Sequence, residues 1–172
     1  HFNGIDRKTI CLLLGIALAL SVVSCVNPFA PKLDTSGEDS ALITQQGSPE
    51  EVFQNLRYAY TFRDSVLYAD VIDSAFTFEF FDPTQGSSAG FESWGRSDEL
   101  NATGELMRRM DALELVWLNV IFQRAVSDTE EIVYRNFKVT FVSSAINATV
   151  QGYGIFTFKR GADGRWRIKR WV

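Results

Sequence analysis

The chain has 172 residues, and its formal net charge of −4 argues against a nucleic-acid-binding protein. Its only histidine is His1, and its only cysteines are Cys11 and Cys25. Beyond residue 25 the sequence therefore offers no imidazole or thiol for Ser-His-Asp or Cys-His catalysis, nor for a zinc site built on those ligands. No cofactor and no metal site is predicted.

Residues 5–25 combine a basic start with an apolar run that ends at a cysteine. Arg7 and Lys8 precede residues 10–23, which are uncharged and apolar. This run is too short to span a bilayer, which needs about 20 residues, but it suits the apolar region of a signal peptide. The segment is therefore predicted to be an export signal.

The apolar run ends in a short motif around a cysteine. Val22 lies three residues before Cys25 and Ser24 lies directly before it, a spacing that resembles the lipobox of bacterial lipoproteins. The resemblance implies that residues 1–24 are cleaved and that a lipid on Cys25 anchors the protein to a membrane of the cell envelope. Val26 favours the outer membrane where the host has one. The alternatives are an ordinary signal peptide or an anchor helix.

Residues 25–47 mix proline, serine, glycine, aspartate and glutamine without periodicity, and they are predicted to form a flexible tether. The folded domain is expected to start at residue 48. Ser48, Pro49 and Glu51 have the pattern of an N-cap, a first-turn proline and a capping box. This pattern predicts a helix whose apolar face carries Val52, Phe53, Leu56, Ala59 and Tyr60.

The middle of the domain is predicted to alternate between helix and strand. A second helix starts at Asp64, a strand ends at Asp82, and residues 84–90 form a loop. A third helix is predicted from its cap at Ser97 through Met110. The predicted strand has a period of two, which is carried by Phe76, Phe78 and Phe80.

Everything after Asp111 is predicted to be strand. Alternating apolar residues and intervening turns indicate strands at residues 113–126, 133–141, 149–159 and 165–172. The segment 161–164 has the composition of a hairpin turn, because it contains two glycines and an aspartate. These strands follow one another closely, so they are expected to pair antiparallel.

The order of these elements resembles the nuclear transport factor 2-like superfamily over residues 48–172. Three motifs carry the resemblance, at residues 48–51, 94–100 and 164–171. It implies an α+β cone in which three N-terminal helices pack in a curved, mostly antiparallel sheet that leaves a pocket at its open end. Members of the superfamily include binding proteins, assembly modules and enzymes, so the fold does not choose among these functions.

The resemblance also allows one kind of catalysis to be tested, that of the ketosteroid isomerase type. Asp82 matches the position of its base, whereas the tyrosine position falls on Ala59, between Tyr58 and Tyr60. The position of its acid falls on Gly154. Because a base without oxyanion donors lacks the largest catalytic contribution, the sequence leans away from an enzyme. Asp82 would then simply mark the end of a strand.

Five residues are candidates for lining the pocket of the implied cone. Arg135 shares a strand face with apolar residues and could bind a carboxylate or phosphate, or pair with a helix acid such as Asp70 or Asp73. The other four candidates are aromatic, and aromatic residues are most often part of the core. They are Tyr58, Tyr60, Trp94 and Trp117.

The leading hypothesis is a non-catalytic lipoprotein whose domain binds a small ligand or an envelope protein. An isomerase or cyclase that uses Asp82 is one alternative. A dimerisation module is the other, since the convex sheets of such cones often pair. The expected partners are thus the membrane, through lipidated Cys25, and an unknown ligand, protein or second copy of the chain.

Overall fold

The computed structural model describes residues 43–82, 84 and 90–172. The predicted signal peptide, Cys25 and most of the predicted tether lie outside these residues. The helices in the described part are α3 (Pro49–Phe62), α4 (Ser65–Val71) and α5 (Arg96–Arg109). The strands there are β1 (Ile72–Asp82), β2 (Gly90–Gly95), β3 (Ala112–Ser127), β4 (Glu130–Val142), β5 (Asn147–Arg160) and β6 (Trp166–Trp171). No helix among the described residues is both long and apolar enough to cross a membrane.

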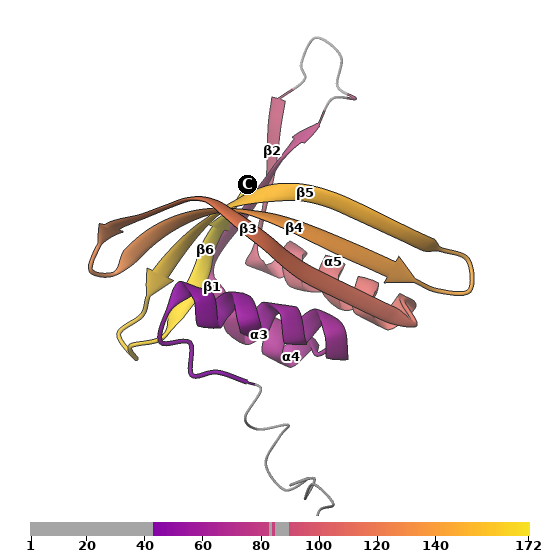
Figure 1. Cartoon of the computed structure of the whole chain (residues 1–172), viewed down its shortest axis with the longest axis horizontal. Coiled ribbons are helices and arrows are strands. Elements are labelled where there is room, and N and C mark those ends of the chain that lie inside the picture. The colour runs from indigo at the N-terminus through magenta and orange to yellow at the C-terminus, as the bar shows by residue number, and fades with distance from the viewer. Residues whose placement is uncertain (1–42, 83, 85–89) are drawn as a thin grey trace, which may run out of the picture. The chain divides into compact units, whose positions relative to one another are not determined.

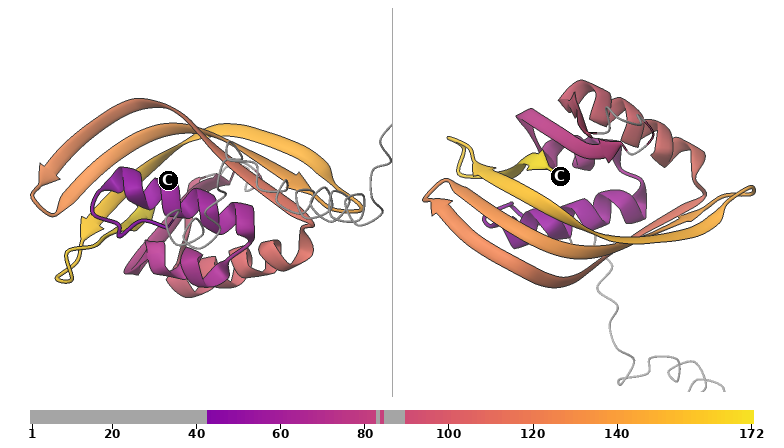
Figure 2. Two further views of the ribbon diagram at one scale, coloured as in Figure 1. Left: turned by 60° about the horizontal axis from the view of Figure 1, so that its bottom comes forward. Right: turned by 90° about the horizontal axis from the view of Figure 1, so that it is seen from above.

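The six strands form one curved sheet in the order β2-β1-β6-β5-β4-β3. All neighbours are antiparallel except β1 and β6, which are parallel, so the last strand lies between β1 and β5. Figures 1 and 2 show the long strands curving around the helices, which lie on one side of the sheet. The predicted α+β class with a curved, mostly antiparallel sheet is confirmed.

Irregularities in strand pairing accompany the curvature of the sheet. The register of β3 against β4 shifts between Trp117 and Val120 and again between Val120 and Phe122. The register of β5 against β6 shifts between Thr157 and Phe158. Such bulges place an extra residue in one strand, which bends that strand and increases its twist. The bulges therefore help the sheet to bend over the helices.

The start of α3 follows from local hydrogen bonds that the sequence predicts. The Ser48 hydroxyl accepts a hydrogen bond from the Glu51 backbone N–H at 3.3 Å, and Pro49 occupies the first turn. The Glu51 carboxylate accepts from the Gly47 N–H at 2.8 Å, one residue before the position expected for a capping box. The Glu51 N–H, one of the N-terminal N–H groups that the helix leaves free, thus has a partner.

Replacing Ser48 with alanine is expected to lower the free energy of unfolding by about 1 kcal/mol, because the cap bond to Glu51 is lost. Urea denaturation of the domain would measure this change. Ser97→Ala is the matched control, since the N-cap of α5 is Gly95 and makes no side-chain cap bond. An equal loss in both variants would contradict the assignment of Ser48 as a cap.

The structure corrects the sequence prediction at the third helix. The helix α5 begins at Arg96, not after a cap at Ser97. A strand that was not predicted, β2, precedes it and pairs antiparallel with the second half of β1, from Thr77 opposite Gly95 to Asp82 opposite Gly90. Gly95 suits the junction because the strand passes directly into the helix there.

The folded part of the chain also starts before Ser48. Gln46 is fully buried, its side-chain amide donates to Asp70 at 2.9 Å, and its carbonyl accepts from the Trp166 N–H at 2.8 Å. The backbone N–H of Thr44 donates to the Asn55 side chain at 2.8 Å. The residues just before Ser48, which were expected to end a flexible tether, therefore pack on the domain.

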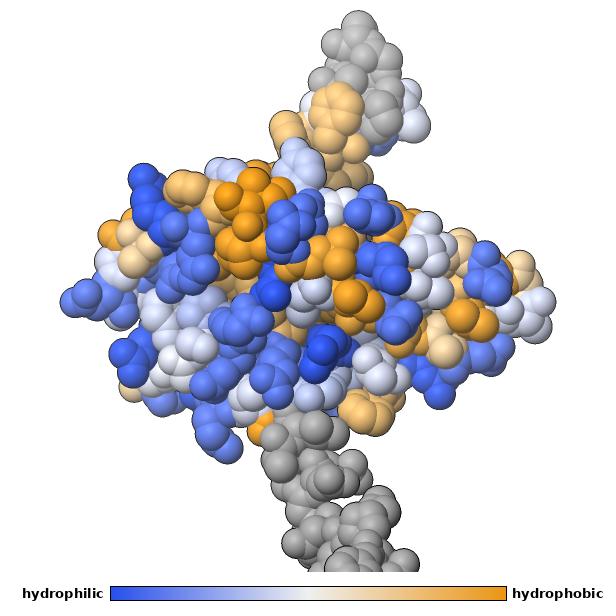
Figure 3. Space-filling view, in the orientation of Figure 1, coloured by the Kyte–Doolittle hydropathy of each residue, from blue (hydrophilic) through white to orange (hydrophobic). Residues whose placement is uncertain are grey.

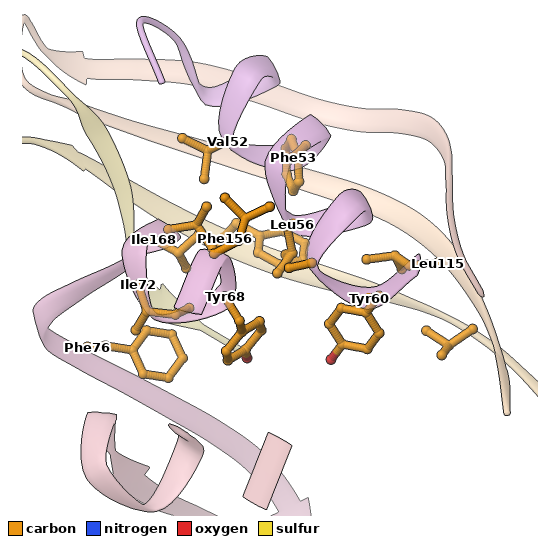
Figure 4. Close-up of a cluster of buried hydrophobic side chains, with 14 of the residues drawn as sticks. Val52, Phe53, Leu56, Tyr60, Tyr68, Ile72, Phe76, Leu115, Phe156 and Ile168 are labelled. Atoms are coloured by element: carbon orange, nitrogen blue, oxygen red, sulfur yellow. The ribbon is translucent and has the colours of Figure 1, made fainter. Parts of the chain in front are cut away.

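The core lies between the helices and the concave face of the sheet. Val52, Leu56 and Ala59 from α3 have no exposed surface, and neither have Phe156, Phe158 and Ile168 from β5 and β6. Figure 4 shows this cluster together with Tyr60 and Tyr68, whose hydroxyl groups point into the same region, away from the aliphatic side chains. A polar site therefore adjoins the apolar core.

Candidate functional site

The polar site is centred on a buried carboxylate. Glu99 is only 6% exposed, and three side chains donate hydrogen bonds to it. Tyr68 donates its hydroxyl to Oε1 at 2.5 Å, and Thr103 donates its hydroxyl to the same oxygen at 2.9 Å. The Trp94 indole N–H donates to Oε2 at 2.7 Å. Neutral donors thus hold both oxygens of the carboxylate.

These side chains come from separate elements. Glu99 and Thr103 lie one turn apart on the same face of α5, and this spacing brings their side chains together. Tyr68 comes from α4 and Trp94 from β2. Tyr60 of α3 packs against Tyr68 with ring centroids 6.0 Å apart. The site therefore exists only when three helices and the β1–β2 hairpin have assembled.

The two tyrosines at the site are held as neutral phenols. Burial raises the pKa of Tyr60 above its ordinary value of 10.0, and the charge of Glu99 raises it further, while a hydrogen bond with Thr103 opposes these effects. Burial likewise raises the pKa of Tyr68 well above 10.0, with the charges of Tyr60 and Glu99 adding to the effect. Tyr68 therefore keeps its proton and can donate a hydrogen bond to Glu99 throughout the physiological pH range.

These raised pKa values predict a loss of stability in alkali. Between about pH 10, the ordinary tyrosine pKa, and the higher values of the folded state, the unfolded chain releases protons that the folded chain retains. The contribution of the two tyrosines to the free energy of unfolding is thus fully present below pH 10, and it is lost as the pH rises above 10. Urea midpoints at pH 8 and pH 11 would measure the fall, which should be smaller in Tyr68→Phe. The control is Tyr153→Phe at an exposed position, in which the urea midpoint should fall between pH 8 and pH 11 as much as in the wild type.

Aromatic side chains line an open pocket of about 260 Å³ beside this carboxylate, which we call the Glu99 chamber. The rings of Phe78 and Trp94 stack with centroids 5.0 Å apart, and Phe78 meets Trp171 edge-on at 5.7 Å. The helix α5 and the aromatic residues together form its walls. Its main lining residues are Tyr60, Phe78, Trp94, Trp171, Glu99, Thr103 and Leu106.

The structure divides the five predicted pocket residues between two places. Tyr60 and Trp94 line the Glu99 chamber. Tyr58, Trp117 and Arg135 instead line a groove of about 460 Å³ between α3 and β3, together with Glu50, Gln54 and Arg57. All five candidates therefore line a cavity, but they do not share the same one.

Arg135 is held within that groove by contacts with the protein itself. Its side chain is 12% exposed, and its guanidinium pairs with Glu50 at 2.6 Å and lies over the ring of Phe53, 4.9 Å from the centroid. Its Nε donates to the Leu118 carbonyl at 3.2 Å. The partner is a helix acid, as one of the two sequence hypotheses held, but it is Glu50 rather than Asp70 or Asp73.

The position of Asp82 does not favour catalysis. Its carboxylate accepts two hydrogen bonds from Thr84, from the backbone N–H at 2.8 Å and from the hydroxyl at 2.7 Å. This is the pattern of an aspartate that ends a strand and starts a turn. Asp82 lines neither the Glu99 chamber, which holds Tyr60, nor the groove, which holds Tyr58. Within the described residues, Asp82 therefore shares neither of these two cavities with Tyr58 or Tyr60.

The acids of the described segments also do not gather into a metal site. No group of three or more histidine, cysteine, aspartate or glutamate residues with suitable spacing lies within them. Glu99 belongs to no such group among the described residues, and its oxygens accept hydrogen bonds from hydroxyl and indole donors.

Comparisons with known proteins establish the fold. No protein-family model and no curated protein matches the sequence. A nuclear transport factor 2-like superfamily protein from Salmonella enterica superposes with a TM-score of 0.55 at 16% identity, covering 70% of this chain and 83% of that one. The chain has the nuclear transport factor 2-like fold.

Two structures from Novosphingobium aromaticivorans are similar as well. A proposed scytalone dehydratase superposes with a TM-score of 0.58 at 14% identity, covering 71% of this chain and 77% of that one. A proposed aromatic ring hydroxylase has the same TM-score at 15% identity, covering 78% and 86%. At such low identity the likeness concerns the nuclear transport factor 2-like fold alone.

Sequence reasoning missed the centre of the site. It placed Glu99 within the third helix without a role in a site, Phe78 on a strand face, and Trp171 only within the motif at residues 164–171. One local signal was present, since Glu99, Thr103 and Met107 are spaced four residues apart on one face of a mostly polar helix. The other contacts join α3, α4, β1, β2 and β6, which only the nuclear transport factor 2-like fold brings together.

Proposed function

We propose that this domain binds a small organic cation, such as a quaternary ammonium compound, in the Glu99 chamber. One observation carries the proposal. A buried carboxylate lies at the wall of an aromatic chamber, and no ion pair among the described residues involves it. Aromatic rings around a carboxylate are the usual means by which proteins recognise ammonium groups.

The electrostatics of the chamber favour a cationic ligand. A buried charge is costly unless an opposite charge or hydrogen bonds compensate it. Three neutral donors compensate Glu99 in part, and a cation in the chamber would complete the compensation. Stacking covers one face each of Phe78 and Trp94, so a cation would meet the remaining ring surface of these two residues and that of Trp171.

The same hydrogen bonds support a binding role rather than catalysis. A carboxylate has about four acceptor positions, and Glu99 already uses three of them for Tyr68, Trp94 and Thr103. A general base must be free to accept a proton from its substrate. Glu99 is thus better placed to hold a charge than to take up a proton.

Binding can be tested with a pair of compounds that differ only in charge. Choline is expected to quench or shift the fluorescence of Trp94 and Trp171, whereas 3,3-dimethylbutan-1-ol, its neutral analogue, is not. Glu99→Gln should weaken choline binding at least tenfold, and Glu105→Gln on the exposed side of α5 should leave it unchanged. Equal binding of both compounds would show that charge recognition is absent.

We propose further that the domain is a lipoprotein of the cell envelope. The lipobox-like residues 22–25 support this. Labelling cells with a radioactive fatty acid should label the wild type and a Cys11→Ser variant, but not Cys25→Ser. Label that persists in Cys25→Ser would refute the anchor.

A further inference from the structure

A second cavity, of about 450 Å³, adjoins the Glu99 chamber, and we call it the apolar cleft. Phe78 and Trp171 line both spaces, so this pair of side chains forms the wall that they share. The cleft opens where β6 ends, between β1 and β5. Val172 pairs there with the backbone of Ile155 at 2.9 and 3.0 Å.

The lining of the cleft is almost wholly apolar. Its charged residue is Glu79, and the Arg170 guanidinium binds this carboxylate and lowers its pKa, so that charge is already matched. Large rings stand exposed at the rim: Phe81 is 55%, Phe91 68% and Tyr153 63% exposed. Figure 3 shows apolar surface on the base of the β1–β2 hairpin and on the strands beside it. The other residues that line the cleft are Phe80, Phe137 and Ile155.

We infer that the ligand is an amphiphile, with its cationic head in the Glu99 chamber and an alkyl tail in the apolar cleft. The inference rests on the proposed function, because it extends the same site. A ligand longer than the chamber meets the cleft next, across Phe78 and Trp171. The cleft offers no unmatched charged side chain within its described lining, so an apolar chain is the occupant that fits it. Such a tail would also cover the exposed rings at the rim.

A series of alkyltrimethylammonium salts, from tetramethylammonium to the decyl compound, tests this inference below the concentration at which micelles form. Each methylene that enters the cleft is expected to lower Kd up to about fourfold, which corresponds to about 0.8 kcal/mol. Isothermal titration calorimetry would measure the series. Alkyl sulfates of equal length provide the charge control and should bind at least tenfold more weakly.

Variants at the rim of the apolar cleft test the binding of the alkyl tail independently of the binding of the cationic head. Phe91→Ser and Tyr153→Ser should leave the Kd of tetramethylammonium unchanged and reduce the gain per methylene. Val66→Ser, at an equally exposed position on α4, should change neither. These positions are exposed, so the variants are expected to fold.

The outcomes distinguish the two proposals. Failure of tetramethylammonium to bind would contradict the proposed function itself. If tetramethylammonium binds but longer alkyl chains do not lower Kd, only the inference that the ligand is an amphiphile would be overturned. The same inference is overturned if alkyl sulfates bind as tightly as the alkyltrimethylammonium salts of equal length. It is also overturned if the rim variants keep the full decrease in Kd per methylene.

Discussion

Replacing Phe156 with alanine is expected to lower the free energy of unfolding by about 3–5 kcal/mol. The side chain has no exposed surface and packs against rings from three other elements. Its centroid lies 5.0 Å from that of Phe53, 5.6 Å from Trp117 and 4.8 Å from Trp171. Alanine would leave a cavity that these rigid rings cannot fill, because they come from a helix and two further strands.

Urea denaturation followed by circular dichroism would measure this effect. Phe62→Ala is the matched control, since the same change is made at a position on α3 that is 61% exposed, and it should have little effect. If Phe156→Ala proves too unstable to purify, Phe156→Leu should show a smaller loss of the same sign. A loss in Phe156→Ala no larger than in Phe62→Ala would contradict the packing described for β5.

Glu99→Leu is expected to lower the free energy of unfolding by about 2–4 kcal/mol. The substitution removes a buried charge, but it leaves the hydroxyls of Tyr68 and Thr103 and the indole N–H of Trp94 without their acceptor. Each buried donor that loses its partner costs about 1–3 kcal/mol, and water entering the chamber would offset part of that. The net result is a loss, although the new side chain is apolar.

Glu99→Gln should have an intermediate effect. The amide keeps one oxygen for Tyr68 and Thr103, but its NH₂ group then faces the Trp94 N–H, and two donors cannot bond to each other. Thermal melts of both variants, with Glu105→Leu as an exposed control on the same helix, would rank the three. Greater stability of Glu99→Leu than of the wild type would contradict the prediction, because it would show that the three donors do not offset the cost of burying the carboxylate.

The elements that the sequence predicted correctly depend on local interactions. The cap of α3 involves residues three apart, and the strands near the C-terminus are joined by short turns, so pattern alone was sufficient. The strand β2 was missed because Gly90–Gly95 is short and mostly exposed and forms a strand only by pairing with β1. The burial of Gln46 was missed because Asp70 and Trp166, which fix it, are distant in the chain.

The candidate site was harder to predict than the fold, and the reason is geometric. Tyr58 and Tyr60 are two residues apart on α3, so they point to different sides of the helix, one to the groove and one to the chamber. Trp117 and Arg135 share the groove because β3 and β4 pair next to it. Without the register of the sheet, the sequence could not show which aromatic residues meet Glu99.

The place of β6 has a consequence for how the polypeptide reaches its native state. This strand comes last among the described elements, yet it joins β1 to β5 in the middle of the sheet. Until it is added, β1–β2 and β3–β4–β5 are separate half-sheets with open edges, which can pair with other chains. Its parallel contact with β1 also spans most of the domain, and such distant pairings form slowly. A nascent chain that lacks β6 therefore cannot form the continuous sheet that covers the core. Folding of the domain is completed only after the C-terminal segment has been synthesised.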